Sequence, residues 1–349
     1  MRLFPGLIKP EYDETFTSWV YRYSKSMPEL GAQLKSIYGF YLLNSSRALT
    51  EDPDFHRSSF FFASVCHLLQ IDADRSWLFF KPAVKDLTPW HNRLHFCALC
   101  IEKDIAQGRL PSWRKSWCYS SSINCVEHMV ELSISSVTPS LAKAWNCFSE
   151  LIQQEKSIQR WDAPLFIRLR ACVVNRLSRW RLNYRRNTNP GLQYSHLEAL
   201  YILSLKVLTY HHPAGSAIYL AGYKKRRCPF ANAKFYSILL EGPGESLPRE
   251  RFIALLIAGW ILHLIPDGEM ALLTNKLRSV GIEFPNNPYM FGYEFLKLFT
   301  VQEYLDVTCL FGAVGDDAPH NLKLFLNGFE RSASVQVPIG SGIKRIITL

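Results

Sequence analysis

Two short pairs of metal-ligating residues are the most informative chemical feature of this sequence. Cys97 and Cys100 form a Cys-x2-Cys pair, and Cys125 and His128 form a Cys-x2-His pair after a spacer of 24 residues. Each pair can form a tight turn that directs two ligands at one point, and the spacer can bring the second pair back to the first. Thiolate and imidazole ligands suit zinc, and four protein ligands leave no position for water or substrate. The spacing therefore predicts one structural zinc site.

The residues around the two pairs leave the ligand set open. Cys118, His91 or His95 could replace one of the four predicted ligands. The alternative interpretation of the whole pattern is a set of free, buried cysteines that hold no metal.

Basic residues are concentrated in one stretch of the second half of the chain. Between Arg160 and Arg186 there are eight arginines and one acid, Asp162. A predicted helix over 164–186 would place apolar residues on one face and arginines around the rest. Because arginine makes bidentate contacts to phosphate, this helix and the basic run at 224–227 predict contact with nucleic acid or an acidic protein face. The candidate residues are Arg168, Arg176, Arg179, Arg186, Lys224, Lys225, Arg226 and Arg227. The alternatives are a solvated helix face and an exposed loop.

The overall charge points to the same class of partner. The 349 residues include 40 lysines and arginines against 30 acids, for a formal net charge of +10. A basic surface attracts polyanions, although a basic protein without a nucleic-acid role is the alternative. The nine cysteines are scattered and odd in number, and the first residues lack the pattern of a signal peptide. We therefore expect reduced thiols and a cytoplasmic protein.

The sequence offers little support for catalysis or for membrane insertion. It contains no GxxxxGK[ST], GxSxG or HExxH motif. The carboxylates are scattered, and the pairs at 72/74 and 316/317 are expected in loops. A zinc-dependent nucleic-acid enzyme would need an open metal position, which a four-ligand site does not provide. The longest apolar run, 252–265, is shorter than the roughly 20 residues of a bilayer span. This run is expected to be a buried helix. The absence of catalytic motifs and of an open metal position predicts that the protein is not an enzyme.

The hydrophobic periodicity predicts a mainly α fold with three parts. Residues 1–90 are expected to form a helical unit that resembles a helix-turn-helix, with Asp13 capping the first helix; a small bundle is the alternative. Residues 91–135 are expected to form a small zinc-ribbon module, and residues 136–349 a helical domain. In that domain the expected helices are 139–157, 164–186, 195–210, 233–241, 248–265, 268–279 and 290–312, separated by signals such as those at 189–191 and 242–244. The final residues, 334–337 and 343–349, are expected to form a β-hairpin.

Two motifs in this order resemble one known family. The sequence DETFTSW at 13–19 with Arg22, and then FCALC at 96–100, PSWR at 111–114, Trp117 and the Cys125/His128 pair, are similar to the TniQ/TnsD family of transposon target-selection proteins. The similarity covers about the first 135 residues. Two departures stand out: Ala98 and Val126 occupy positions where the family often has proline, and only Cys147 is present where many members have a second cysteine pair.

The resemblance implies a role and a set of partners. It implies an adaptor that selects the insertion site and recruits an AAA+ regulator and a transposase. In one branch of the family the adaptor binds an attachment site in DNA directly. In the other, shorter members form dimers and bind the RNA-guided Cascade complex of a CRISPR-associated transposon, through its guide-processing and backbone subunits and guide RNA. The length of this chain favours the second branch, so the expected partners are Cascade, the AAA+ regulator, a second copy of the chain and, in the alternative, target DNA.

Overall fold

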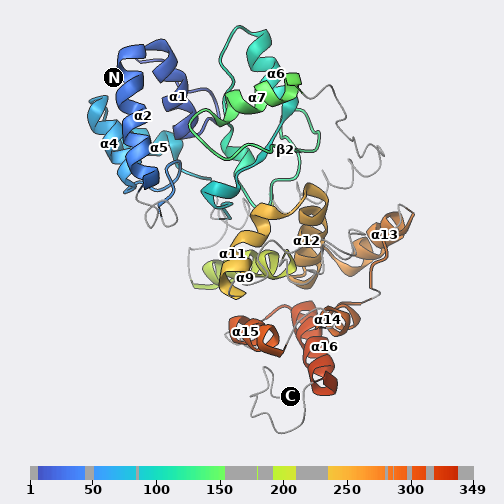
Figure 1. Cartoon of the computed structure of the whole chain (residues 1–349). Coiled ribbons are helices and arrows are strands. Elements are labelled where there is room, and N and C mark those ends of the chain that lie inside the picture. Colours follow the sequence, from blue (N-terminus) through green and yellow to red (C-terminus); the bar gives the residue numbers. More distant parts are fainter. Residues whose placement is uncertain are drawn as a thin grey trace. The chain divides into compact units, whose positions relative to one another are not determined.

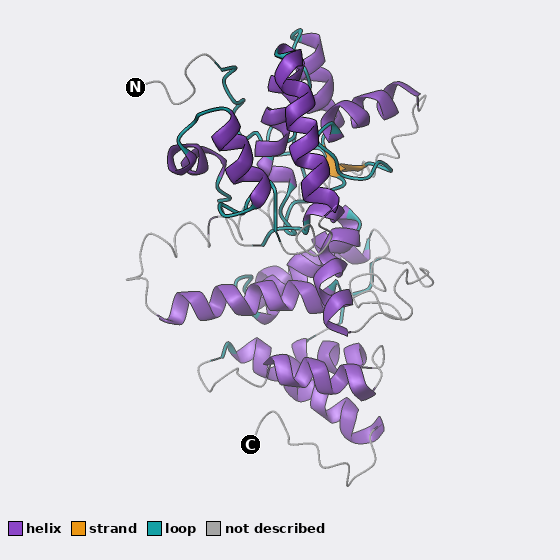
Figure 2. Ribbon diagram, turned by 60° about the vertical axis from the view of Figure 1, so that its left-hand side comes forward, coloured by secondary structure: helices purple, strands orange, loops and turns teal. Residues whose placement is uncertain are grey.

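The computed structural model describes most of the chain and divides it into two compact units, 1–161 and 162–349. The described residues are 7–43, 51–83, 86–153, 179, 192–209, 235–279, 282–285, 287–296, 301–311 and 318–336. Helices dominate both units, and the described strands are confined to one short pair in the first unit (Figures 1 and 2). The predicted mainly α fold is therefore confirmed.

The first unit begins with four helices around an aromatic core. They are α1 (Phe16–Ser26), α2 (Pro28–Leu43), α4 (Phe60–Leu68) and α5 (Ala73–Phe80). The rings of Phe16, Phe62 and Phe80 contact one another, with centroid separations of 4.5 Å and 5.1 Å from Phe16. Trp19 and Phe61 are fully buried beside them. Apolar side chains at helical spacing therefore produce the expected helices, and the core lies where they converge.

The remainder of the first unit has short elements and few helical turns. It contains the 3-10 turns η1 (Trp90–Asn92) and η2 (Lys115–Trp117), strands β1 (His95–Phe96) and β2 (Ser133–Ile134), and helices α6 (Ala98–Ala106) and α7 (Lys143–Gln153). The strands pair antiparallel, with His95 opposite Ile134 and Phe96 opposite Ser133. A second apolar core fills this part, where Trp113 and Trp117 pack edge to face at 5.4 Å. The division of the first unit at residue 90 stays a prediction.

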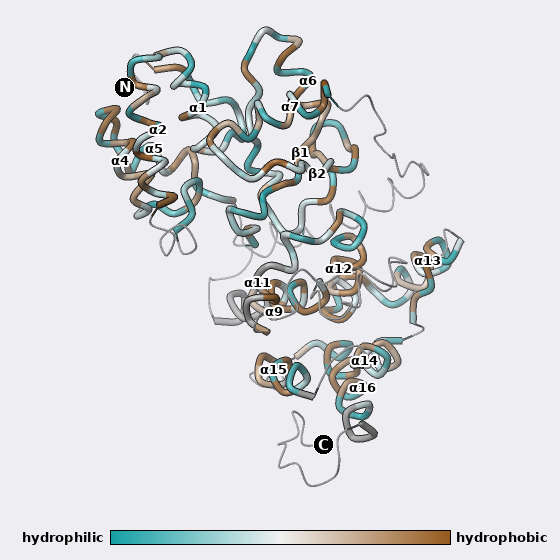
Figure 3. The backbone as a smooth tube through the Cα atoms, in the orientation of Figure 1, coloured by the Kyte–Doolittle hydropathy of each residue, from teal (hydrophilic) through white to brown (hydrophobic). Residues whose placement is uncertain are grey.

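The described helices of the second unit include one that is almost entirely buried. They are α9 (Leu192–Leu208), α11 (Phe235–Glu245), α12 (Pro248–Ile261), α13 (Asp267–Arg278), α14 (Pro288–Leu296), α15 (Val301–Phe311) and α16 (His320–Gln336). Every residue of α12 except the half-buried Arg249 is buried, and its apolar residues are visible in Figure 3. Residues 252–261 of the apolar run are thus a core helix, as predicted, but the helix ends before 262–265, where His263 is exposed and has a φ of 56°. No helix in the part of the chain that the structure describes combines the length and the hydropathy of a membrane span.

Helices α14 and α16 cross at two glycines. A Cβ on Gly292 would lie 1.9 Å from the carbonyl oxygen of Phe325, and one on Gly328 would lie 2.0 Å from that of Tyr289. Only glycine permits so close an approach of two backbones. The side chains of Phe291, Phe295, Phe325 and Phe329 pack around this crossing.

Several sequence predictions were wrong in detail. Thr15, not Asp13, precedes α1, because Asp13 adopts a left-handed φ of 63° and its carboxylate accepts a hydrogen bond from the backbone N–H of Ser116. The pair at 72/74 is not in a loop: Asp72 caps α5 through the N–H groups of Asp74 and Arg75. Local propensity could not reveal these roles, since the Asp13 partner lies about a hundred residues away in sequence.

In the second unit the errors concern helix boundaries. The helix expected at 290–312 is two helices, α14 and α15, with bounds that leave 297–300 between them. The signal at 242–244 does not separate helices but lies inside α11. Residues 334–336, expected in a strand, are the end of α16. Short apolar runs are ambiguous between helix and strand, and the packing of α16 on α14 decides the outcome here. The predicted 164–186 helix and the strand at 343–349 lie outside the described residues, apart from Arg179.

Candidate metal centre

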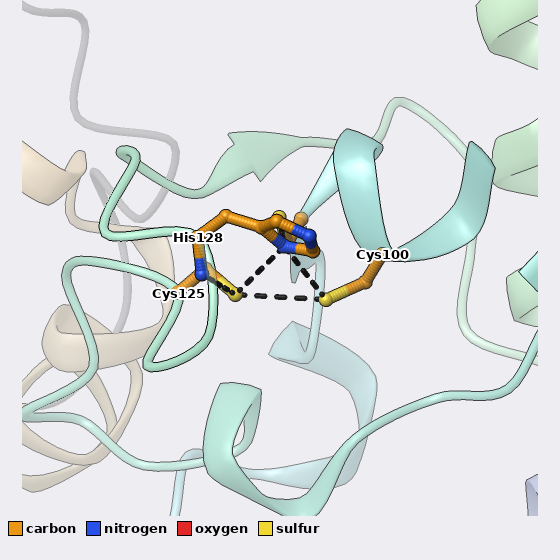
Figure 4. Close-up of side chains that lie close together, drawn as sticks. Cys100, Cys125 and His128 are labelled. Carbon is orange, nitrogen blue, oxygen red and sulfur yellow. Dashed lines mark hydrogen bonds between the residues drawn. The ribbon is translucent and has the colours of Figure 1, made fainter. Parts of the chain in front are cut away.

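The four predicted ligands meet at one point in the first unit. The sulfur atoms of Cys97, Cys100 and Cys125 and a ring nitrogen of His128 all lie within 4.8 Å of one another. Nδ1 of His128 is 3.3 Å from the sulfur of Cys100 and 3.6 Å from those of Cys97 and Cys125, and the sulfurs of Cys100 and Cys125 are 3.5 Å apart (Figure 4). The three cysteines are buried and the histidine is half-buried.

Four of the six separations among the ligand atoms match the edges of a tetrahedron around one metal ion. With metal–sulfur bonds of about 2.3 Å and a metal–nitrogen bond of about 2.0 Å, tetrahedral geometry requires ligand separations of roughly 3.5–3.8 Å. The observed 3.3–3.6 Å agrees with that requirement to within a few tenths of an ångström. The group can therefore hold a metal ion, and all four coordination positions belong to the protein.

The backbone explains how each pair presents its ligands. Cys97 is the residue before α6 and Cys100 lies in its first turn, so both thiols are at the N-terminal end of that helix. The Cys125/His128 pair is a tight turn, in which the N–H of Met129 donates to the carbonyl of Cys125 at 2.9 Å. Met129 has a φ of 55°, which closes the turn and lets the N–H of Cys125 donate to the carbonyl of Val130. The N–H of His128 also points at the Cys125 sulfur, at 3.5 Å.

The thiols of Cys100 and Cys125 lie close enough to form a hydrogen bond in the absence of a metal ion. Hydrogen bonds from Cys100 and Cys97 lower the pKa of Cys125 well below the usual thiol range. The same hydrogen bond raises the pKa of Cys100, because that thiol must keep its proton in order to donate it. The cluster thus already favours a thiolate at Cys125, and an incoming metal ion must displace the remaining thiol protons.

The three alternative ligands, Cys118, His91 and His95, are not part of the group of four. Among the residues that the structure describes, the His and Cys side chains close enough to share an ion are the four predicted ones. Cys118 is fully buried, but its thiol donates to the backbone carbonyl of Arg114 at 3.5 Å. Neither His91 nor His95 joins the group.

The spacer between the two pairs is bound to the start of α1. The N–H of Thr15 donates to the carbonyl of Trp113 at 2.9 Å, and the N–H of Trp113 donates to Oγ of Ser18 at 2.8 Å. The Ser18 hydroxyl in turn donates to Glu14 at 2.9 Å. The two sequence motifs that carry the family resemblance are therefore the two sides of one contact.

Glu14 is the buried centre of that contact. Its side chain is fully buried and accepts hydrogen bonds from Arg22 at 2.7 Å and from the backbone of Glu11 at 2.8 Å. Burial raises the pKa of Glu14 to about 7, although the nearby Arg22 charge and these hydrogen bonds oppose the shift. Burial is the larger effect because a carboxylate loses its water shell in the core.

A second buried carboxylate fixes the same spacer. Asp104 of α6 accepts hydrogen bonds from both the N–H and the hydroxyl of Ser112, at 3.0 Å and 2.8 Å. It also pairs with Arg109 and Arg114. The ion pairs hold the spacer against the helix that carries Cys100.

A third cluster, which sequence reasoning missed, joins α7 to the helical half of the first unit. The fully buried Asp54 accepts hydrogen bonds from Thr17 and pairs with Arg93 and Lys143, each at 3.1 Å. Burial alone would raise the pKa of Asp54, but the two cations lower it. The ammonium of Lys143 also lies 3.9 Å from the ring centroid of Trp90. These residues are far apart in sequence and form no motif, so spacing carries no signal of them.

Among the predicted basic residues, the structure describes Arg179 alone. Arg179 is helical and exposed. Arg168, Arg176, Arg186 and the run from Lys224 to Arg227 lie outside the described residues.

Comparison with known proteins identifies the first part of the chain. Residues 5–132 match the model of the TniQ family. The matched range contains both motifs, the α1 contact and all four candidate ligands. No curated protein and no solved structure matches the chain. The first compact unit of the protein therefore contains a TniQ domain over residues 5–132.

Proposed function

We propose that this protein is a non-enzymatic adaptor that links an RNA-guided Cascade complex to an AAA+ regulator and a transposase. The observation that supports it best is the TniQ match over residues 5–132, in which both family motifs are used to build one structural contact. An adaptor needs a rigid surface rather than a reactive centre. A metal ion held by four protein ligands keeps the surrounding backbone rigid. Cascade subunits with their guide RNA, the AAA+ regulator and a second copy of this chain are the proposed partners.

The metal ion in this proposal is zinc, one per chain. Three thiols and one imidazole at tetrahedral spacing form a donor set that zinc prefers, and its role is structural because no position is left for substrate. Glu127, which pairs with Lys103 and lies 3.8 Å from the Cys100 sulfur, is the carboxylate next to the site. Its pairing with a lysine leaves it poorly suited as a general base.

A co-elution experiment tests the adaptor. Purified chain is mixed with the Cascade complex of a CRISPR-associated transposon, loaded with guide RNA, and the mixture is separated by size. We expect the chain to elute with Cascade as a dimer, and not with the same subunits lacking guide RNA. Elution of the chain alone at all ratios would contradict the proposal.

Direct recognition of an attachment site in DNA is the second candidate. Charge favours it, since residues 162–349 contain 22 lysines and arginines against 14 acids. Affinity for one duplex that exceeds non-specific affinity by about 10³ or more at moderate salt, without RNA or Cascade, would support this candidate and reject the first. Replacing Lys224–Arg227 by glutamines should then weaken binding and reduce its salt dependence, with Lys276→Gln as the single-charge control.

A further inference from the structure

The second compact unit contains a groove that the proposed function does not use. It lies among α12, α13, α14 and α16 and encloses about 430 Å³. That volume falls within the range of pockets that bind small ligands, about 300–1,000 Å³. Apolar side chains of Met270 and Leu324 contribute to its lining together with polar groups. The polar lining residues that matter below are Asp267, Thr274, Asn275, Arg278 and His320.

One end of the groove presents a fixed negative charge. Asp267 is the first residue of α13, and its Oδ1 accepts hydrogen bonds from Nε1 of Trp260 and Nδ2 of Asn321, both at 3.0 Å. These two donors come from side chains that are only 4% and 2% exposed, so they hold the carboxylate rigidly. The hydrogen bonds from Asn321 and Trp260 also lower the pKa of Asp267. Asp267 itself is exposed and forms no ion pair with any residue that the structure describes.

The other end presents a positive charge. Arg278 is the last residue of α13, is exposed, and likewise has no ion-pair partner within the described ranges. At 1.5 Å of rise per residue, the backbones of Asp267 and Arg278 are about 16 Å apart along the helix. Neutral side chains, Thr274 and Asn275, lie between them. The groove is therefore a neutral channel with opposite unpaired charges at its two ends.

We propose that this groove binds an extended peptide segment of a protein partner, with a lysine or arginine at the Asp267 end and a carboxylate at the Arg278 end. In an extended segment the first and fifth residues are about 13 Å apart, and the long side chains of arginine and glutamate can cover the remaining distance to the two charges. An apolar side chain in the middle of the segment would pack on Met270 and Leu324. Nucleic acid fits less well, because the fixed carboxylate of Asp267 repels phosphate. This inference concerns a surface outside the TniQ domain and does not depend on which targeting complex the chain serves.

Fluorescence polarisation with a short probe tests the groove. The full chain is titrated at pH 8, where histidines are generally neutral, into labelled Arg-Ala-Leu-Ala-Glu with blocked termini. We expect saturable binding below about 1 mM, and binding weaker by about tenfold or more for the uncharged peptide Gln-Ala-Leu-Ala-Gln. Arg278→Gln should weaken binding of the first peptide by about tenfold, whereas Lys276→Gln, an exposed cation on the same helix outside the groove, should leave it unchanged.

The choice of variants keeps the test independent of folding. Asp267 accepts hydrogen bonds from Trp260 and Asn321, so its loss can disturb the unit, whereas Arg278 is exposed and has no ion-pair partner among the described residues. The single exchange Arg278→Glu should abolish binding of the charged peptide, and the double exchange Asp267→Lys with Arg278→Glu should restore it. Three results would each overturn the proposal: no saturable binding up to about 1 mM, equal binding by Arg278→Gln, or displacement of the peptide by a short single-stranded DNA that binds more tightly.

Discussion

The two compact units are stabilised in different ways. In residues 1–161, buried polar contacts join distant segments in addition to the two apolar cores: Glu14 with Arg22, Asp104 with the spacer, and Asp54 with Lys143. In the described part of residues 162–349, α9 and α16 pack on the apolar α12, and α14 meets α16 at two glycines. The two units also differ in net charge. The first contains 18 basic and 16 acidic residues, and the second contains 22 basic and 14 acidic residues.

This difference has a structural reason. The metal-ligating half of the first unit has few helical turns, so its backbone cannot satisfy its own hydrogen bonds and relies on side chains such as Ser18 and Asp104. The second unit satisfies its backbone within helices and needs only complementary apolar faces. We therefore expect the first unit to respond to metal and pH, and the second to respond to changes in volume.

Loss of a metal ligand should have the largest effect. Structural zinc contributes apparent free energies of about 10–16 kcal/mol in small zinc domains, so Cys97→Ser or His128→Ala is expected to cost more than about 5 kcal/mol of first-unit stability. Because Trp113 is hydrogen-bonded to Thr15 and Ser18, the loss should extend to α1. Native mass spectrometry should show bound zinc falling from about one per chain, and hydrogen exchange should show faster exchange in α1 but not in α12.

Cys118→Ser is the matched control for this experiment. It makes the same substitution at a buried cysteine of the same part of the chain, outside the ligand group. The variant should retain about one zinc per chain. Equal loss of zinc from Cys118→Ser, or full zinc content in both ligand variants, would refute the ligand assignment.

The pH response of Glu14 is the next largest effect. Its pKa is about 7 in the folded protein against 4.5 ordinarily, so the folded state binds the proton more tightly than the unfolded chain. The resulting stabilisation is complete below about pH 4.5 and is lost as the pH rises to about 7, by roughly 3 kcal/mol at 1.36 kcal/mol per unit. Removal of zinc by acid acts in the opposite direction, so the wild type must be compared with Glu14→Gln, which cannot titrate.

Urea unfolding of both proteins between pH 5 and pH 8, followed by tryptophan fluorescence, measures this difference. The stability of the wild type relative to Glu14→Gln should fall as the pH rises through this interval. A constant difference would show that Glu14 has an ordinary pKa in the folded state.

The sequence predicted the metal ligands better than it predicted what positions them. Cys97, Cys100, Cys125 and His128 are two local pairs, and local turns are readable from spacing. Asp54, Arg93 and Lys143 meet across 39 and 89 residues of sequence, and such a contact depends on the folded core. The same limit applies to α16, whose short apolar runs resemble strands until its packing on α14 is known. The hydrogen bond from Ser116 to Asp13 could not be predicted for a related reason, because Ser116 lies in the spacer, far from Asp13 in sequence.

The smallest of the three effects comes from adding one methyl group at a tightly packed position of the second unit. A Cβ on Gly328 would lie 2.0 Å from the carbonyl oxygen of Tyr289, so Gly328→Ala must separate α14 from α16 and should cost about 2 kcal/mol. Gly268→Ala is the matched control, because nothing lies within 4 Å of its added methyl group and alanine favours the helix by up to about 1 kcal/mol. Hydrogen exchange should rise in α14 and α16 of Gly328→Ala while zinc content and α1 exchange stay at wild-type values. If zinc content or α1 exchange changed as well, the two units would be coupled, and the contrast between a metal-dependent unit and a volume-dependent one would have to be abandoned.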